Sequence, residues 1–146
     1  MTWAQALPEQ APEEAAPTPT APVLSREERL AAATPPPEGT ERMRVAIGDS
    51  PVRGTEDALV TVVAFNDFHC PYSRRGADTI AQVLQEYGAD IRLVFKQNPL
   101  PMHPEAPLAH QAALAAGAQG KFWEMHDLIF ANTQARSRED LEGFAQ

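Results

Sequence analysis

The residue with the clearest capacity for chemistry is Cys70, the only cysteine in the chain. It follows an apolar run at 60–65 and precedes Pro71, so we expect it at the junction of a strand and a helix. A helix start presents N–H groups without intrahelical partners and a partial positive charge, and both favour a thiolate. Pro71 suits the first helical position, where its missing N–H costs nothing. The pattern therefore predicts a nucleophilic thiol at Cys70.

The residue three positions after Cys70 is Ser73, where a dithiol redox motif has its second sulfur. In such a motif the second thiol resolves the mixed disulfide that the first one forms. A hydroxyl does not displace a thiolate from sulfur, so Ser73 limits the site to one-thiol chemistry or to a covalent trap. The Ser73 hydroxyl can still donate a hydrogen bond to a Cys70 thiolate. The alternative is that Cys70 is a small buried residue in an inactive protein.

Three charged residues near Cys70 each have two interpretations. Asp67 either relays protons, if it is buried, or caps a turn or helix start. Arg74 and Arg75 either add positive potential beside the thiol or belong to a solvated helix face.

The histidines are considered as possible metal ligands, and the aromatic residues in the last third of the chain as core residues. Pro104 and Pro107 place His103 before the helix that holds His110, and the histidines lack the tight spacing of metal ligands. We therefore predict no metal and no cofactor. Aromatic residues in the last third of the chain are expected in the core. The histidines concerned are His69, His103, His110 and His126, and the aromatic residues are Phe122, Trp123 and Phe130.

Length and composition predict one modest domain with a tail. The chain has 146 residues, and eight of its 14 prolines lie in residues 1–43 among alanines and glutamates. We expect residues 1–43 to form a disordered leader or linker, with a short helix at 26–33 capped by Ser25. Residues 44–146 are expected to form the folded domain.

Charge and hydropathy exclude several classes of function. The net charge of −8 divides evenly, with three basic and seven acidic residues before Arg44 and nine basic and 13 acidic residues from there on. This balance gives no electrostatic footprint for nucleic acid. The chain shows no transmembrane run of 18 apolar residues and no signal peptide at its start. A single cysteine excludes an internal disulfide.

The folded part is predicted to begin with a strand–helix–strand unit. Residues 44–51 look like a short edge strand, and residues 59–65 like a central strand buried on both faces. A helix from Pro71 to the stop at Gly88 would bury one apolar stripe, formed by Ala77, Ile80, Ala81, Leu84 and Tyr87. Residues 91–95 would form a second central strand, parallel to the first.

Helices are predicted for the remainder. Residues 104–118 and 121–131 are rich in apolar residues and are separated by Gly120. A last helix is expected after Ser137, whose type and acidic neighbours suit a helix start.

Four blocks of sequence, in order, resemble bacterial DsbA-like thiol-disulfide oxidoreductases. They are Val45–Gly48 with Pro51–Gly54, Val60–Phe68 leading into Cys70–Pro71–Tyr72, Arg92–Lys96 with Pro99–Leu100 and His103–Pro104, and Gln119–His126. The resemblance implies an α/β protein with a thioredoxin-like fold and a helical insertion. It also implies that Cys70 is the nucleophile, that Pro71 and Tyr72 belong to the motif, and that Ser73 occupies the resolving-cysteine position.

The chain departs from that family in a second respect, because the family continues with further strands and a closing helix. A sheet lacking these strands would expose an unpaired edge, which favours dimerisation, and the chain would then be the front of a longer reading frame. The resemblance implies a periplasmic location, with a leader that tethers the domain.

Function is predicted as monothiol or degenerate thiol-disulfide exchange, with protein thiols, protein disulfides or glutathione as partners. One alternative is glutathione conjugation, since kappa-class glutathione transferases resemble the same fold, although their motif serine takes the position of Cys70. The other alternative is a redox-inactive thioredoxin-like module that binds a peptide or a protein.

Overall fold

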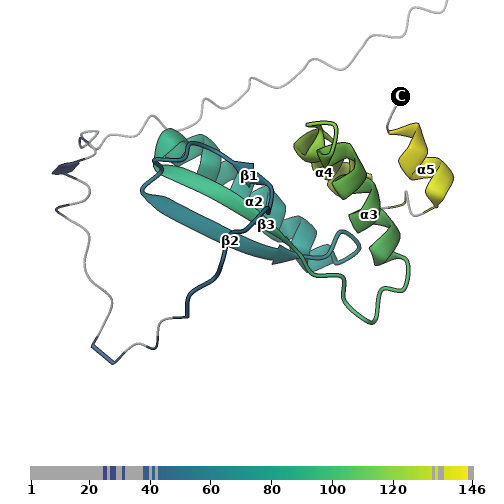
Figure 1. Ribbon diagram of the computed structural model, residues 1–146, viewed down its shortest axis with the longest axis horizontal. Helices are drawn as coiled ribbons and strands as arrows, with labels where there is room; N and C mark the ends of the chain where they lie inside the picture. Colours follow the sequence, from purple (N-terminus) through teal and green to yellow (C-terminus); the bar gives the residue numbers. More distant parts are fainter. Residues whose placement is uncertain are drawn as a thin grey trace, which may run out of the picture. The chain divides into compact units, whose positions relative to one another are not determined.

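A computed structural model of the chain describes residues 25, 27–28, 31, 38–39, 41, 43–132, 134 and 137–144. The elements, in chain order, are shown in Figure 1. They are β1 (Val52–Arg53), β2 (Val60–Asn66), α2 (Pro71–Tyr87), a 3-10 turn (Gly88–Asp90), β3 (Ile91–Gln97), α3 (Ala106–Gly117), α4 (Phe122–Ala131) and α5 (Arg138–Gly143).

The helix predicted at 26–33 falls mostly outside the described residues. Its described members, Glu27, Glu28 and Ala31, are helical. The Ser25 hydroxyl accepts a hydrogen bond from the Glu28 N–H at 3.2 Å, and the Glu28 carboxylate accepts one from the Ser25 N–H at 2.6 Å. This reciprocal pair is the capping arrangement expected of Ser25.

The described strands form one sheet in the order β1–β3–β2. β2 and β3 are parallel, with Val60 opposite Ile91 and Asn66 opposite Gln97. β1 is antiparallel to β3 and places Val52 opposite Val94. The predicted parallel strand–helix–strand unit is therefore confirmed.

The edge strand predicted at 44–51 is wrong, because pairing begins only at Val52. A turn at Gly48, with φ of 55°, and a proline without an N–H at position 51 interrupt the approach to the sheet. The segment is nevertheless attached to β3, since Lys96 Nζ donates to the Ile47 carbonyl at 2.8 Å and the Phe95 N–H donates to the Pro51 carbonyl at 3.0 Å.

The sequence predicts β2 to be a central strand buried on both faces, and this prediction is also wrong for the described sheet. It pairs with β3 alone, Ala64 is its only buried residue, and Val60 and Phe65 are 50% and 56% exposed. The apolar composition of β2 suits a strand that is paired on both sides, but composition does not show whether a second partner strand is present.

α2 begins at Pro71 and ends before Gly88, as predicted, and Gly88 has φ of 53° and donates its N–H to the Leu84 carbonyl. The predicted buried stripe is wrong, since no residue of α2 is fully buried. Its apolar residues instead line a groove of about 380 Å³ between α2, the sheet and α4. These residues are Ala77, Ile80, Ala81 and Leu84.

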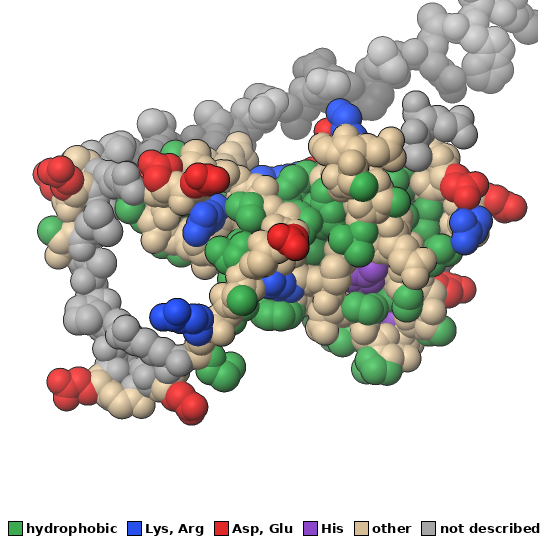
Figure 2. All heavy atoms as spheres, viewed as in Figure 1, with side chains coloured by type: hydrophobic (Ala, Val, Ile, Leu, Met, Phe, Trp, Pro, Cys, Tyr) green, Lys and Arg blue, Asp and Glu red, His purple; other side chains and the backbone are tan. Residues whose placement is uncertain are grey.

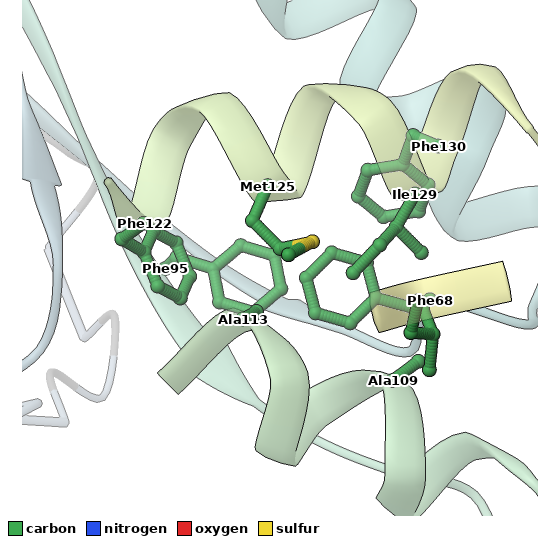
Figure 3. Close-up of a cluster of buried hydrophobic side chains, with 9 residues drawn as sticks. Phe68, Phe95, Ala109, Ala113, Phe122, Met125, Ile129 and Phe130 are labelled. Carbon is green, nitrogen blue, oxygen red and sulfur yellow. The ribbon is translucent and has the colours of Figure 1, made fainter. Parts of the chain in front are cut away.

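The core lies where the helices α3, α4 and α5 meet the end of the sheet (Figure 3). Phe68, which follows β2, stacks on Phe95 of β3 with ring centroids 5.2 Å apart and contacts Phe130 of α4 at 5.0 Å. The aromatic residues predicted for the core are there, with Phe122 and Phe130 buried and Trp123 packed beside them. Phe68 thereby anchors the loop that leads to Cys70.

The last two predicted helix starts agree with the structure. α4 begins directly after Lys121, and α5 begins after Ser137, whose hydroxyl accepts a hydrogen bond from the Asp140 N–H at 3.1 Å.

Figure 2 shows Lys and Arg side chains scattered among acidic ones on the face that is drawn. Within the described residues, no helix has both the length and the hydropathy needed to cross a membrane.

Candidate functional site

Cys70 lies between the end of β2 and the start of α2, as the sequence predicts. It is the N-cap residue of α2, with extended backbone angles, and Pro71 occupies the first helical position. Its carbonyl accepts the Arg74 N–H at 3.1 Å, which closes the first turn of the helix. Cys70 is a free cysteine, and the residue as a whole is partly exposed.

Ser73 lies in the first turn of α2, and its hydroxyl is already bonded to the loop before the helix. Ser73 Oγ accepts a hydrogen bond from the backbone N–H of Asp67 at 3.1 Å. The hydroxyl keeps its own proton, which remains available for donation. Tyr72 is 73% exposed, and the guanidinium of Arg75 lies 5.1 Å from its ring centroid. Arg75 therefore packs on Tyr72 at the helix surface.

Asp67 is only 1% exposed, and its carboxylate gathers donors from two loops. Oδ1 accepts the His69 N–H at 2.7 Å, within the Cys70 loop. Oδ2 accepts the Leu100 N–H at 2.8 Å and contacts Nδ1 of His103 at 2.7 Å, both in the loop after β3. Of the two interpretations, turn capping is confirmed; proton relay stays a prediction.

The charge of Asp67 is favoured by these bonds in spite of its burial. Burial alone raises the pKa of this carboxyl, but the hydrogen bonds from Leu100, His103 and His69 outweigh it, and the net pKa lies below its usual value. An ionised carboxylate is therefore the state that this arrangement stabilises.

The other histidines form separate pairs. His110 Nδ1 bonds to Gln97 Oε1, and burial lowers the pKa of His110 in spite of the nearby charge of Asp67. His126 Nδ1 bonds to Asp127 at 2.7 Å, and burial lowers the pKa of His126 as well. Among the described residues, no group of three or more His, Cys, Asp or Glu side chains is placed to hold a metal ion.

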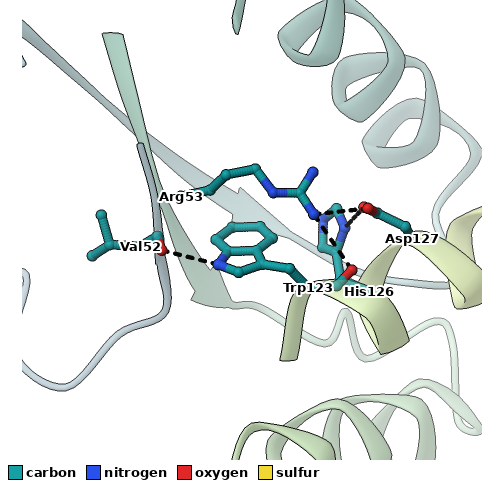
Figure 4. A network of polar contacts seen from close by, with 5 residues as sticks. All are labelled: Val52, Arg53, Trp123, His126 and Asp127. Carbon is teal, nitrogen blue, oxygen red and sulfur yellow. Dashed lines mark hydrogen bonds and ion pairs between the residues drawn. The ribbon is translucent and has the colours of Figure 1, made fainter. Parts of the chain in front are cut away.

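A second polar network, which the sequence analysis missed, joins β1 to α4 (Figure 4). Arg53 donates to Asp127 at 2.7 Å, and its guanidinium lies 4.5 Å from the ring centroid of Trp123. Trp123 in turn donates its indole N–H to the Val52 carbonyl at 3.0 Å. Two of the four blocks of family resemblance supply Arg53 and Trp123, and that was the available signal, whereas Asp127 lies one position beyond the last block.

The structure therefore brings together Cys70, Ser73, Asp67 and His103 at one end of the sheet. Asp67 and His103 are 36 positions apart, and no local pattern predicts their pairing.

Comparison with known proteins places this geometry in a family. A family model described as Thioredoxin matches residues 47–146. Among curated proteins, the Na(+)/H(+) antiporter NhaA 1 of Salinispora arenicola is 44% identical over 96 residues, which cover 65% of this chain and 15% of the antiporter. The chain thus spans about 15% of the length of that relative.

Two solved structures have the same fold at low sequence identity. The thiol-disulfide exchange protein alpha-DsbA2 of Wolbachia pipientis has a TM-score of 0.60 and 22% identity, over 68% of this chain and 54% of that one. A periplasmic thioredoxin-like protein of Salmonella enterica serovar Typhimurium has a TM-score of 0.61 and 21% identity, over 73% and 65%. The fold is thus thioredoxin-like and of the DsbA type, and the chain belongs to the thioredoxin family.

Proposed function

We propose that the domain carries out thiol-disulfide exchange through Cys70 alone. The observation that supports this is the placement of a free, partly exposed cysteine as the N-cap of α2, in a thioredoxin-like fold. The Cys70 thiolate attacks a substrate disulfide, forms a Cys70–S–S–R bond and releases the other half as a thiolate. An external thiolate such as that of glutathione then attacks the mixed disulfide, frees the Cys70 thiolate and leaves with the R group.

Ser73 and the other motif residues have supporting roles in this proposal. The hydroxyl of Ser73 holds the Asp67 N–H and has a proton to direct at the Cys70 thiolate. Pro71 starts the helix without losing a hydrogen bond, and the exposed Tyr72 is available to an approaching protein. The partners we propose are protein thiols, protein disulfides and glutathione.

Intact mass after incubation with oxidised glutathione at neutral pH tests the function. We expect one glutathione per chain, removable by added thiol, and none on Cys70→Ser. Ser73→Cys restores a second thiol, so we expect it to expel the bound glutathione and form an internal disulfide. A folded wild-type chain that takes up no glutathione contradicts the proposal and favours a redox-inactive binding module, whereas glutathione held without covalent attachment favours the transferase alternative.

We also propose a setting for the domain. Residues 44–146 form the working unit and residues 1–43 a tether, in the periplasm, where the similar Salmonella protein is found. The identity of 44% to an antiporter supports attachment to a membrane transporter of that kind. If the complete open reading frame that encodes this chain also encodes transmembrane segments, the attachment is supported. If it encodes none, the attachment is overturned.

A further inference from the structure

We propose that Asp67 and His103 form a positioning pair that holds Cys70 in its reactive conformation. This inference rests on the proposed function, since it assigns residues that act through the Cys70 loop. Neither residue touches the substrate in this account, so both are positioning residues rather than catalytic ones.

Asp67 joins the three parts of the site through its backbone and side chain together. Its N–H donates to Ser73 Oγ, and its carbonyl accepts the Cys70 N–H at 3.1 Å. Its carboxylate accepts from His69 in the same loop, and from Leu100 and His103 in the loop after β3. One buried residue thus fixes the backbone of Cys70 and attaches it to a second loop.

The acceptor at position 67 has to be a carboxylate. Three donors from two directions converge on its two oxygens, and buried donors without an acceptor are costly. An asparagine offers one oxygen, so its NH₂ group would face the Leu100 N–H or the His69 N–H, donor against donor. The bonds to His69 and Leu100 are charge-assisted, which makes them stronger than bonds to a neutral acceptor.

His103 completes the pair from the opposite loop. Its side chain is 24% exposed, and Nδ1 is directed at Asp67 Oδ2, where a proton on Nδ1 offsets part of the carboxylate charge. That offset matters for Cys70, because a bare buried carboxylate beside the loop opposes a second negative charge on the thiolate. Loss of the His103 donor should therefore reduce thiolate reactivity without opening the core.

Iodoacetamide alkylation of Cys70 at pH 7 tests the pair independently of disulfide exchange. We expect the rate to fall roughly ten-fold in His103→Ala, a loss equivalent to one hydrogen bond. We expect it to fall also in Asp67→Asn, because the displaced Cys70 loop outweighs the removal of the carboxylate charge. His103→Asn, which keeps a donor close to the position of Nδ1, should restore most of the rate. In the double variant Asp67→Asn/His103→Ala the two losses should not multiply, because the second change removes a partner that is already lost.

Asp127→Asn is the matched control, since Asp127 also accepts from a histidine but lies on α4 and is 55% exposed. It should leave the alkylation rate within two-fold of wild type. An unchanged or higher rate in folded His103→Ala, or no recovery in His103→Asn, overturns the proposal even if Asp67→Asn fails to fold. Because alkylation needs no disulfide, a wild-type chain that alkylates but takes up no glutathione contradicts the proposed function and leaves this test valid.

Discussion

At the scale of single residues, Gly54 shows how closely β1 approaches β3. Its φ is 113°, which L side chains rarely adopt. A Cβ at this position would lie 2.9 Å from Cα and Cβ of Arg92 and from the Ile91 carbonyl oxygen, which are parts of β3 that cannot move independently. The glycine is therefore required both for its backbone angle and for the space it leaves.

Gly54→Ala should destabilise the domain, because the substitution adds a strained backbone angle and a clash with the centre of the sheet. We expect a loss of about 2 kcal/mol or more in the free energy of unfolding, measured by urea titration. Gly48→Ala is the control, since φ there is 55° but nothing lies within 4 Å of the added Cβ. Its expected cost is about 1 kcal/mol, and equal costs for the two variants would show that the close approach is unimportant.

Local signals in the sequence located much of the candidate site. Cys70 with Pro71 identified the helix start, and Gly88 identified its end, because such signals act within one turn of the chain. The bonds from Asp67 to His103 and from Arg53 to Asp127 join residues 36 and 74 positions apart. Pairings at that separation depend on how the elements pack, which a single sequence does not specify.

At the scale of elements, the outer edge of β2 pairs with no other strand in the part of the chain that the structure describes, and nothing in the sequence of β2 protects that edge. Residues 60–66 contain no charge and no proline, the usual devices that prevent edge-to-edge association. Two copies of β2 can pair antiparallel, with the two Val63 residues opposite each other. Each side chain then lies beside a side chain that projects from the same face of the joined sheet. We propose self-association through this edge.

Variants at the centre of that pairing test the association. Val63→Lys places like charges opposite each other, as does Val63→Glu, so each should be monomeric in sedimentation analysis at concentrations where wild type associates. An equal mixture of the two variants should associate again. Tyr87→Lys, at an exposed position on α2, is the control for added charge and should behave as wild type. Association of both single variants at wild-type strength would exclude the β2 edge.

At the scale of the whole molecule, buried histidines make stability depend on pH. Burial lowers the pKa of His110 and of His126, so the unfolded chain binds protons more readily than the folded one below a pH of about 6.5. Their contribution is fully present above that pH and is lost as the pH falls toward the lowered pKa values. Asp67 and Asp127, whose pKa values are also lowered, add a second loss below about pH 4.

Urea unfolding between pH 8 and pH 5 checks this expectation. The free energy of unfolding should fall with a slope of at most about 1.4 kcal/mol per pH unit for each histidine. His126→Phe should flatten the profile, because a phenyl ring suits the surrounding aromatic rings and does not titrate. If the profile of His126→Phe is as steep as that of wild type, the pH dependence of stability comes from other groups.

The bonds between β1 and α4 have a consequence for the order of folding. Val52 and Trp123 are 71 positions apart, so their contact closes a long loop, whereas β2, α2 and β3 meet through short connections. Closing a long loop costs entropy that short-range contacts do not require. We therefore expect the strand–helix–strand unit to assemble first and the docking of β1 on α4 to complete the domain.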